Sequence, residues 1–445
     1  MILKFVDREE ELKALKSLQT AAIIYGRRRI GKTALVKEFI KGKKAFYFLC
    51  QKNKIEAEFE RFLNKFNRTF SRYIEARNFE EFFESIKKEE IIIVLDEFSY
   101  WVEKNPEIPS LFQYIIDEIL KEGKTKIIFC GSLISTIESL LSYKNPLYGR
   151  IKLKIKVEQL KFKFLKEFLP NYSLEDLIKV YSCVGGIPAY LQEFDKDLSV
   201  YENLDRLFFN KFGFLYEDAE RLLKDELREP EIYFRIIESI ASGETTLGKI
   251  SSKAFVDITN LPKYLRTLKK MRIIKEERSV LGKSRIIKIA DNYFNFWIRF
   301  VHPFREEIEL GVFSFPEEKF NTYLGEVFEE VCKEFLIETR FFPFTKIGRW
   351  WHKDKEIDIV ALNEKTKEIL FGECKWQSKV NALKIAEELA EKSRYVQWHN
   401  RERKESFAIF AKSFSKKISN FEGKKVYCFD LHDLEKMSKA NLVKQ

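Results

Sequence analysis

The stretch AAIIYGRRRIGKTALVKEF (residues 21–39) decides the fold of the first part of this chain. Its apolar run at 21–25 predicts a buried strand, and the apolar spacing after residue 32 predicts a helix. Between them stands GRRRIGKT (26–33), which matches the phosphate-binding pattern GxxxxGK[ST] without deviation. Because this pattern lies between a strand and a helix, the sequence predicts a nucleotide-binding loop here.

The residue types of this loop suit a triphosphate with Mg²⁺. Its glycines allow the main chain to wrap the phosphates, and the N–H groups at the helix start hold negative charge. Lys32 is expected to reach the β- and γ-phosphates, and the Thr33 hydroxyl to bind Mg²⁺. We therefore expect ATP and Mg²⁺ as cofactors. The predicted nucleotide-binding residues are Gly26, Arg27, Arg28, Arg29, Ile30, Gly31, Lys32, Thr33 and Ala34.

Two later apolar runs end in residues suited to ATP hydrolysis. The run EIIIVLDE (90–97) ends in Asp96, which can hold Mg²⁺, and in Glu97, which can act as general base on the attacking water. KIIFCGS (126–132) ends in Ser132, which could contact the γ-phosphate or the water. A plain turn at the end of the strand is the alternative for Ser132.

The first half of the chain alternates apolar runs with amphipathic stretches. Continuous apolar strands that alternate with helices indicate a parallel sheet covered on both faces. Residues 160–228 are helical in pattern, without a strong strand. The predicted strands are 21–26, 43–50, 90–97 and 126–132, and helices are predicted over 33–42 and 110–123.

Composition and charge limit the class of protein. A length of 445 residues predicts two to four domains. A net charge of +11 favours a nucleic-acid partner, DNA more than RNA, although a basic proteome is the alternative. Charged residues make up 33%, mostly Lys and Glu, which suits a thermophile. Six scattered cysteines indicate neither zinc nor disulfides. With no spanning run or signal peptide, we expect a cytoplasmic protein without membrane contact.

Together these residues resemble the archaeal ATPase family within the AAA+/STAND group of P-loop NTPases. Four further segments carry the resemblance: FVDREEELKAL (5–15), NPLYGR (145–150), GGIPAYL (185–191) and DNYFNFWIRFV (291–301). The resemblance implies Arg150 as an arginine finger or sensor, with a surface arginine as the alternative. It places Pro188 in a helical lid near the adenine, with a plain turn as the alternative. A finger acting in trans would require a homo-oligomer, and cis or trans stays open.

Residues 232–290 have the pattern of a winged helix, with three helices and then a two-stranded ribbon turning at Gly282. The third helix, expected over 260–274, has an apolar stripe opposite a basic face. Such a helix can enter the major groove of DNA, or the domain can serve only in protein packing. The basic residues are Lys263, Arg266, Lys269, Lys270 and Arg272.

A third constellation lies near the C-terminus. Asp358 stands in the predicted strand EIDIVAL (356–362), whose residues 357, 359 and 361 are expected on the opposite, apolar face. Glu373 and Lys375 share one face of the next strand, 368–375. Two carboxylates can hold Mg²⁺ or Mn²⁺, and a lysine can orient the attacking water. A solvated charged face is the alternative.

This segment resembles the PD-(D/E)xK nuclease superfamily and the DUF234 type of C-terminal domain. The resemblance adds Glu329, in GEVFE on the preceding helix, as a further metal ligand beside Asp358 and Glu373. It implies a catalytic role for Lys375. The proline of the superfamily name is absent, because Ile357 precedes Asp358. Gln377 could also line the site.

We predict an α/β multi-domain protein with a restriction-endonuclease-like C-terminal domain. ATP binding and hydrolysis would control nucleic-acid binding or metal-dependent cleavage. The alternative is a STAND-like signalling or scaffold switch with a non-catalytic C-terminal domain, and a transcription regulator is a third reading. The expected domains are the ATPase core 1–158, a helical lid 159–228, a winged helix 229–292, a connector 293–322 and the nuclease-like domain 323–445.

Overall fold

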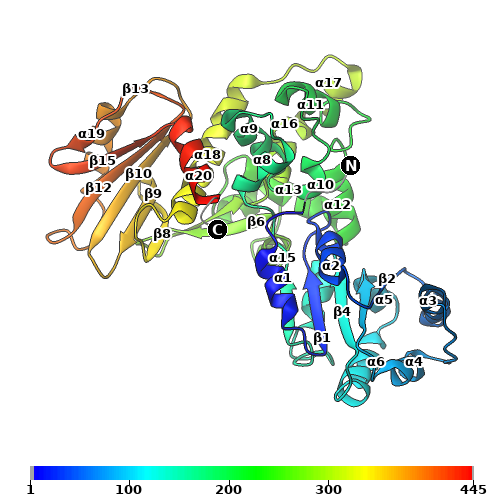
Figure 1. Cartoon of the computed structure of the whole chain (residues 1–445). Helices are drawn as coiled ribbons and strands as arrows, with labels where there is room; N and C mark the ends of the chain where they lie inside the picture. The colour runs from blue at the N-terminus through cyan, green and yellow to red at the C-terminus, as the bar shows by residue number, and fades with distance from the viewer. Residues whose placement is uncertain (1–4, 443–445) are drawn as a thin grey trace. The chain divides into compact units, whose positions relative to one another are not determined.

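The computed structural model describes residues 5–442, which form two units (Figure 1). The first unit holds the chain up to Phe164 together with Ile187–Gln192, and the second holds Leu165–Gly186 and everything from Glu193 on. The region expected as one helical lid is therefore divided between the units. No helix within residues 5–442 is both long and apolar enough to cross a membrane.

The first unit is built on a five-stranded parallel sheet in the order β2-β3-β4-β1-β5. The four strands predicted from apolar runs are confirmed. The fifth was missed because IKLKIKV alternates lysines with apolar residues, as suits an edge strand that pairs only with β1. The strands are β1 Ala21–Tyr25, β2 Ala45–Leu49, β3 Ile92–Asp96, β4 Lys126–Gly131 and β5 Leu153–Lys156.

Helices cover both faces of this sheet, as two separate apolar cores show. One core is rich in aromatic rings, including Phe46, Phe62 and Phe82, and the other packs Leu35 of α2 against Ile24 of β1. The helix predicted over 110–123 becomes a π-helix at Ile115–Ile119. The helices are α1 Glu9–Lys16, α2 Lys32–Ile40, α3 Ile55–Phe70, α4 Phe79–Ile86, α5 Phe98–Lys104, α6 Ile108–Tyr114, α7 Ile134–Leu140 and α10 Pro188–Leu191.

A buried carboxylate ties the aromatic core of the first unit together. Glu58 on α3 is fully buried and accepts hydrogen bonds from Trp101 Nε1 at 2.7 Å and from the Gln51 N–H at 2.9 Å. Arg61 and Asn53 donate to it at 2.7 and 3.1 Å. Burial alone would raise the pKa of Glu58, but these donors outweigh burial and lower it.

The second unit begins with helices and continues with the three helices and ribbon expected at 232–290. The third helix, α15, ends at Lys270 rather than near 274, because Arg272 takes a left-handed φ of 60° and Ile274 starts a strand. Before the ribbon lie α8 Leu165–Phe168, α9 Leu174–Val184, α11 Val200–Leu207, α12 Asp218–Glu226, α13 Pro230–Ala241, α14 Leu247–Ala254 and α15 Leu261–Lys270. The ribbon is β6 Ile274–Arg278 and β7 Arg285–Ile289, and α16 Asn292–Phe300 and α17 Arg305–Leu310 follow.

A six-stranded mixed sheet, in the order β14-β15-β12-β10-β9-β8, forms the C-terminal part of the second unit. Figure 1 shows α19 on one face of this sheet and α18 and α20 on the other. The helices are α18 Glu317–Thr339, α19 Ala382–Ser393 and α20 Leu431–Leu442. The strands are β8 Lys346–His352, β9 Lys355–Asn363, β10 Glu368–Lys375, β12 Lys404–Ala411, β14 Asn420–Phe421 and β15 Lys424–Phe429, with β11 Val380–Asn381 and β13 Phe414–Lys416 paired separately.

The turn of the β6–β7 ribbon packs on β8, at the edge of the C-terminal sheet. Val280 donates its N–H to the Arg349 carbonyl at 2.9 Å, and its side chain is buried in the same core as Trp350. Gly348 lies beside this contact, where a Cβ would be 3.4 Å from Val280 Cβ, at van der Waals distance. The ribbon and the C-terminal sheet thus share one core.

The Glu58→Ala variant should lower the free energy of unfolding by about 2 kcal/mol at pH 7, because the N–H groups of Trp101 and Gln51 lose their acceptor. The pKa of Glu58 is lower in the folded protein, so its stabilisation is present above the usual value of 4.5 and is lost as the pH falls below it. Denaturant melts at pH 7 and pH 3.5 measure the difference. The matched control is Glu60→Ala on the exposed side of α3; an equal loss in both variants contradicts the assignment.

Candidate active sites

The predicted phosphate-binding loop runs from the end of β1 into the start of α2. Gly31, with φ +94°, caps α2, and a Cβ on Gly26 would meet the Val157 carbonyl oxygen at 2.5 Å. Left-handed residues in such a loop, Arg29 (φ 69°) among them, turn successive N–H groups toward an anion. Lys32 Nζ donates to the Gly26 and Arg27 carbonyls at 2.9 Å each, so the ammonium lies inside the loop. These residues fit a polyphosphate.

A buried arginine stabilises this loop through hydrogen bonds to main-chain carbonyls. Arg8 donates to the Ile30 carbonyl at 3.2 Å and to the Glu158 carbonyl at 2.8 Å, and is 4% exposed. It therefore ties the loop to the chain that follows β5. Sequence reasoning noted the segment 5–15 but assigned no role to Arg8. The available signal was an arginine next to the start of an apolar-faced helix.

The predicted magnesium ligands lie together. Thr33 Oγ1 donates to Asp96 Oδ2 at 2.8 Å, and the Tyr47 hydroxyl donates to the same oxygen at 2.5 Å. Burial, and then the bond to Asp96, raise the pKa of Tyr47 far above its usual value, so the phenol stays a donor. Thr33 and Asp96 would hold Mg²⁺ between them. Tyr47 was not predicted, since nothing in its strand distinguishes it from a core aromatic.

The predicted general base is held by the predicted strand-end serine. Glu97 Oε2 accepts the Ser132 hydroxyl at 2.6 Å and the Ser132 N–H at 3.2 Å. The pair forms because β4 lies between β1 and β3, which places the end of β4 beside both motifs. Glu97 takes a left-handed φ of 56° at the start of α5. Ser132 thus orients Glu97 beside the loop that fits the phosphates.

The GGIPAYL segment contributes to this site. Pro188 Cγ would lie 3.9 Å from a Cβ on Gly31, so the proline contacts the phosphate loop. The Ala189 N–H points at the Arg29 carbonyl at 3.5 Å, and the Arg29 guanidinium lies 5.5 Å from the Tyr190 ring centre. The structure therefore places Pro188 against the phosphate loop, and its expected position near the adenine stays a prediction.

Arg150 lies away from the phosphate loop. It pairs with Asp117 at 2.9 Å and lines a cavity of about 1020 Å³ that also borders Thr20 and Ala21, at the start of β1. The phosphate loop follows the other end of β1, and the five residues of this strand span about 16 Å. Arg150 is therefore too far for a contact with nucleotide in its own chain.

The C-terminal carboxylates meet where two strands separate. The β9–β10 ladder ends at the pair Ile359–Gly372, so Asp358 and Glu373 stand opposite each other one residue beyond it. Asp358 Oδ2 accepts the N–H of Cys374, between Glu373 and Lys375, at 2.9 Å. The geometry expected from the sequence at this hairpin is therefore present.

The expected alternation along β9 is wrong. Ile357 packs in the same core as Val360 and Leu362, whereas strict alternation places Ile357 on the other face. A register shift between β8 and β9, at Gly348–Trp350, breaks the alternation beside Asp358. Bulges of this kind re-aim side chains and are frequent next to active sites.

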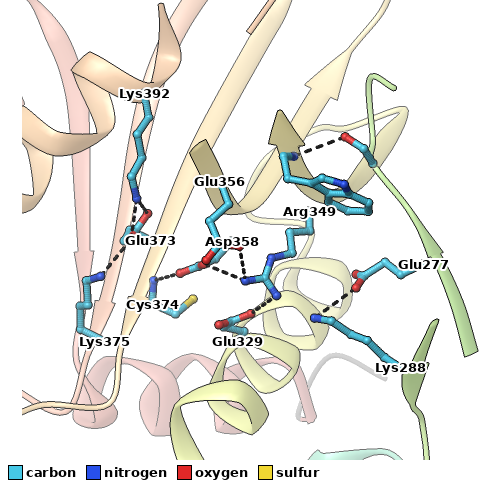
Figure 2. A network of polar contacts seen from close by, with 12 residues as sticks. Glu277, Lys288, Glu329, Arg349, Glu356, Asp358, Glu373, Cys374, Lys375 and Lys392 are labelled. Atoms are coloured by element: carbon cyan, nitrogen blue, oxygen red, sulfur yellow. Dashed lines mark hydrogen bonds and ion pairs between the residues drawn. The ribbon is translucent and has the colours of Figure 1, made fainter. Parts of the chain in front are cut away.

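Cations surround each carboxylate (Figure 2). Glu373, 4% exposed, accepts from Lys375 at 2.9 Å and from Lys392 of α19 at 3.0 Å. Lys392 was not predicted, because a lysine in the last turn of a helix usually faces solvent. Arg349 of β8 lies 3.2 Å from Glu329, 2.9 Å from Glu356 and 4.0 Å from Asp358, and Figure 2 shows it between them.

Negative charge is crowded on the side of Asp358 that faces α18. Burial first, and then the charge of Asp358, raise the pKa of Glu329 to about 8. Burial and then Glu373 raise the pKa of Asp358 to about 6. Burial lowers the pKa of Lys375, but Glu373 outweighs burial and raises it. Lys375 therefore stays protonated and positively charged beside these carboxylates.

The predicted three-carboxylate metal site needs correction. Within residues 5–442 no group of three or more His, Cys, Asp or Glu side chains is arranged to hold a metal ion. Glu329 faces Arg349, while Glu373 faces two lysines, so Glu329, Asp358 and Glu373 do not converge. Asp358 and Glu373 remain neighbours beyond the end of the β9–β10 ladder, where Lys375 and Lys392 hold Glu373. Gln377 is exposed in the turn after β10.

Comparison with known proteins gives two family matches. Residues 5–194 match a model described as an ATPase domain predominantly from Archaea, and residues 297–387 match DUF234, described as archaeal and bacterial proteins of unknown function. An uncharacterized protein of Methanocaldococcus jannaschii is 39% identical over 448 residues, covering 96% of this chain and 99% of the relative.

Two shorter or more distant similarities agree. An uncharacterized ATP-binding protein of the same organism is 46% identical over 48 residues, which is 10% of this chain and 81% of that protein. A Walker-type ATPase of Pyrococcus abyssi superposes with a TM-score of 0.52 at 22% identity, covering 66% of this chain and 96% of that one. This structural likeness supports the fold of the ATPase part.

The Glu97→Gln variant should bind ATP like the parent and hydrolyse it about 100-fold or more slowly, because the amide cannot take a proton from the attacking water. Lys32→Ala should instead lose nucleotide binding. Calorimetry with ATP and a phosphate-release assay separate the two effects. The control is Glu107→Gln, an exposed carboxylate near α6. Parent-like turnover in Glu97→Gln contradicts its role as base.

Proposed function

This chain belongs to the archaeal ATPase family, and from that premise we propose that its ATP binding and hydrolysis control nucleic-acid binding or metal-dependent cleavage by the C-terminal part. ATP binding and hydrolysis are supported by the hydrogen bonds between residues around the phosphate loop. Lys32 lies inside the loop, Thr33 bonds Asp96, and Ser132 orients Glu97.

In this site, Lys32 and the loop amides would bind the phosphates, and Thr33 and Asp96 would hold Mg²⁺. The metal would supply charge neutralisation at the phosphates. Glu97 would take the proton of the attacking water, while Ser132 keeps the Glu97 carboxylate in place. Arg8 stabilises the conformation of the loop by donating a hydrogen bond to the Ile30 carbonyl.

A covalent route connects the nucleotide site to the second unit. Ile187–Gln192 belongs to the first unit and contacts the phosphate loop through Pro188, but both of its flanks belong to the second unit. A shift of this segment on nucleotide binding would therefore pull on the chain at Gly186 and Glu193. Such a link lets ATP bias the state of the second unit.

Cleavage by the C-terminal part rests on the geometry at the separated strands. Asp358 and Glu373 oppose each other, and Lys375 follows on the strand of Glu373. Carboxylates in this arrangement can hold Mg²⁺ or Mn²⁺, which would polarise a phosphodiester. Lys375 would then orient the water or stabilise the developing negative charge.

Helix α15 supports the nucleic-acid partner. Its apolar stripe, with Leu261, Leu265 and Leu268, is buried, and a basic face remains outside. Lys269 is engaged by Glu276 of the ribbon, and Arg272 lies beyond the helix. The face proposed to contact DNA phosphates is formed by Lys263, Arg266 and Lys270, all exposed.

One observation favours a second function, a signalling or scaffold switch. Glu373 already pairs with Lys375 and Lys392, and Glu329 pairs with Arg349, so both carboxylates have cationic partners without a metal ion. In that case the C-terminal part would bind a partner without cutting, and Glu373→Ala would leave function unchanged.

Asp358→Asn should abolish cleavage of labelled DNA or RNA in the presence of Mn²⁺, because the pair of carboxylates is lost, while ATP hydrolysis continues. A gel assay with single- and double-stranded substrates, with and without ATP, measures this. The control is Glu387→Ala on the exposed face of α19. No cutting by the parent under any condition, in a sample that hydrolyses ATP, removes the nuclease proposal and favours the switch.

Arg150 is proposed as an arginine finger in trans, since it is too far from the loop of its own chain. The Arg150→Ala and Lys32→Ala variants should each lose most ATPase activity, and mixing them should restore part of it in shared oligomers. The restored activity should rise with protein concentration. An inactive mixture, or a fully active Arg150→Ala variant, contradicts the proposal.

A further inference from the structure

The turn between α14 and α15 exposes a phenylalanine. Phe255 directly follows α14, and its side chain is 86% exposed, so the ring adds little to the core. Its backbone takes a left-handed φ of 53°, which is rare for a bulky residue and is usually occupied by glycine at the end of a helix. Neither packing nor backbone conformation favours phenylalanine here, and such positions are concentrated at functional sites.

Hydrogen bonds on both sides of Phe255 fix this turn. Arg235 Nε donates to the Ala254 carbonyl at 3.1 Å. Ser251 Oγ donates to the Val256 carbonyl at 2.7 Å. Ala254 and Val256 are buried, whereas Phe255 between them is exposed. The turn therefore presents the ring on a fixed backbone.

The turn holds a second exposed apolar residue before α15 begins. Ile258 is 53% exposed. Asp257 Oδ1 accepts the N–H of Thr259 at 2.7 Å, which orders the backbone on either side of Ile258. Two exposed apolar side chains, Phe255 and Ile258, thus precede the first turn of α15.

The helices on either side of this turn are strongly basic. Residues 247–270 contain six lysines and arginines and one acidic residue, Asp257. Apolar groups within a basic surface suit a polyanion that offers apolar groups between its phosphates, as the grooves of DNA do. A membrane surface suits it less, because the apolar stripe of α15 is buried in the core. The exposed basic residues include Lys249, Lys253, Lys263 and Arg266.

The tip of the β6–β7 ribbon is already occupied. Val280 in its turn bonds the Arg349 carbonyl of β8 and is buried in the core of the C-terminal sheet. In a helix-turn-helix, the second helix enters the major groove with its N-terminal residues at the base edges. Contacts with bases would therefore come from the start of α15 and from the turn before it.

We propose that this turn recognises thymine in the major groove of duplex DNA, with the Phe255 ring on the thymine methyl group and the lysines of α14 and α15 on the flanking phosphates. Among the four DNA bases, only thymine presents a C5-methyl group in the major groove, and apolar side chains contact it. The major groove of double-stranded RNA is too deep and narrow for side chains to contact the bases there. This recognition depends on the proposed nucleic-acid binding and narrows its substrate to duplex DNA that contains thymine.

The test uses full-length protein that carries Asp358→Asn, so that DNA is not cut, with and without ATP and Mg²⁺. Fluorescence anisotropy follows a labelled random-sequence DNA duplex. The competitors are unlabelled duplexes with thymine, the same duplexes with deoxyuridine in place of thymine, duplex RNA, and phosphatidylserine vesicles. We expect the thymine duplexes to bind about fourfold more tightly than the deoxyuridine duplexes, the factor expected for burial of one methyl group.

Variants at Phe255 separate recognition from a structural role. Phe255→Gly should bind both DNA pools equally and should not lower the melting temperature, because glycine suits a φ of 53° and the lost ring is exposed. Phe255→Leu, which keeps an apolar side chain, should retain part of the preference. The matched control is Phe212→Ala, since Phe212 is also 86% exposed and lies outside this turn. Lys263→Ala should weaken both pools by the same factor, because it removes a phosphate contact.

The outcomes distinguish failure of this recognition from failure of nucleic-acid binding. Equal binding of both pools, or a thymine preference that survives Phe255→Gly, overturns the recognition of thymine and leaves nucleic-acid binding in place. Stronger competition by vesicles than by DNA assigns the surface to a membrane instead. If no nucleic acid binds, both this recognition and the proposed nucleic-acid binding are wrong.

Discussion

In a parallel sheet, the residues that follow each strand lie at the same edge of the sheet. The nucleotide site depends on that constraint. β4 lies between β1 and β3, so the loop after β1, the acids after β3 and Ser132 after β4 become neighbours. Two short hydrogen bonds, Thr33 to Asp96 and Ser132 to Glu97, then set the positions of the side chains. The flanking cores hold the strands rigid, so these bonds do not need a ligand to form.

The network around Asp358 and Glu373 depends on a different constraint. Its carboxylates are buried on strands and a helix, where charge must be neutralised locally. In the structure Arg349, Lys375 and Lys392 do so, and a divalent cation could replace part of them only by displacing these side chains. Under the proposed metal binding, these side-chain cations and the metal would compete for the same carboxylates.

Much of the first unit could be predicted from sequence because its signals are local. The apolar strands, the loop at 26–33 and the strand-end residues Asp96, Glu97 and Ser132 all follow one another within short windows. The edge strand β5 was missed because half of its side chains face away from the core. Arg8 and Tyr47 were missed because their roles depend on partners far along the chain, at Glu158 and Asp96.

The C-terminal site was predicted less completely for the same physical reason. Asp358, Glu373 and Lys375 stand on paired strands, so periodicity brings them together. Arg349 of β8 reaches Asp358 and Lys392 of α19 reaches Glu373, and no spacing rule links β8 or α19 to these strands. The bulge beside Asp358 also depends on the partner strand β8, which was not predicted from the sequence.

The docking of the ribbon on β8 has a consequence for dissecting the protein. β8 is the outer strand of its sheet, and Val280 covers part of its free edge while filling the core around Trp350. A fragment that starts after the ribbon would expose the edge of β8. It would also lack the Val280 side chain, which would leave a cavity in the core. Uncovered strand edges recruit other chains, so such a fragment would be prone to self-association, whereas a fragment that keeps the ribbon would stay shielded.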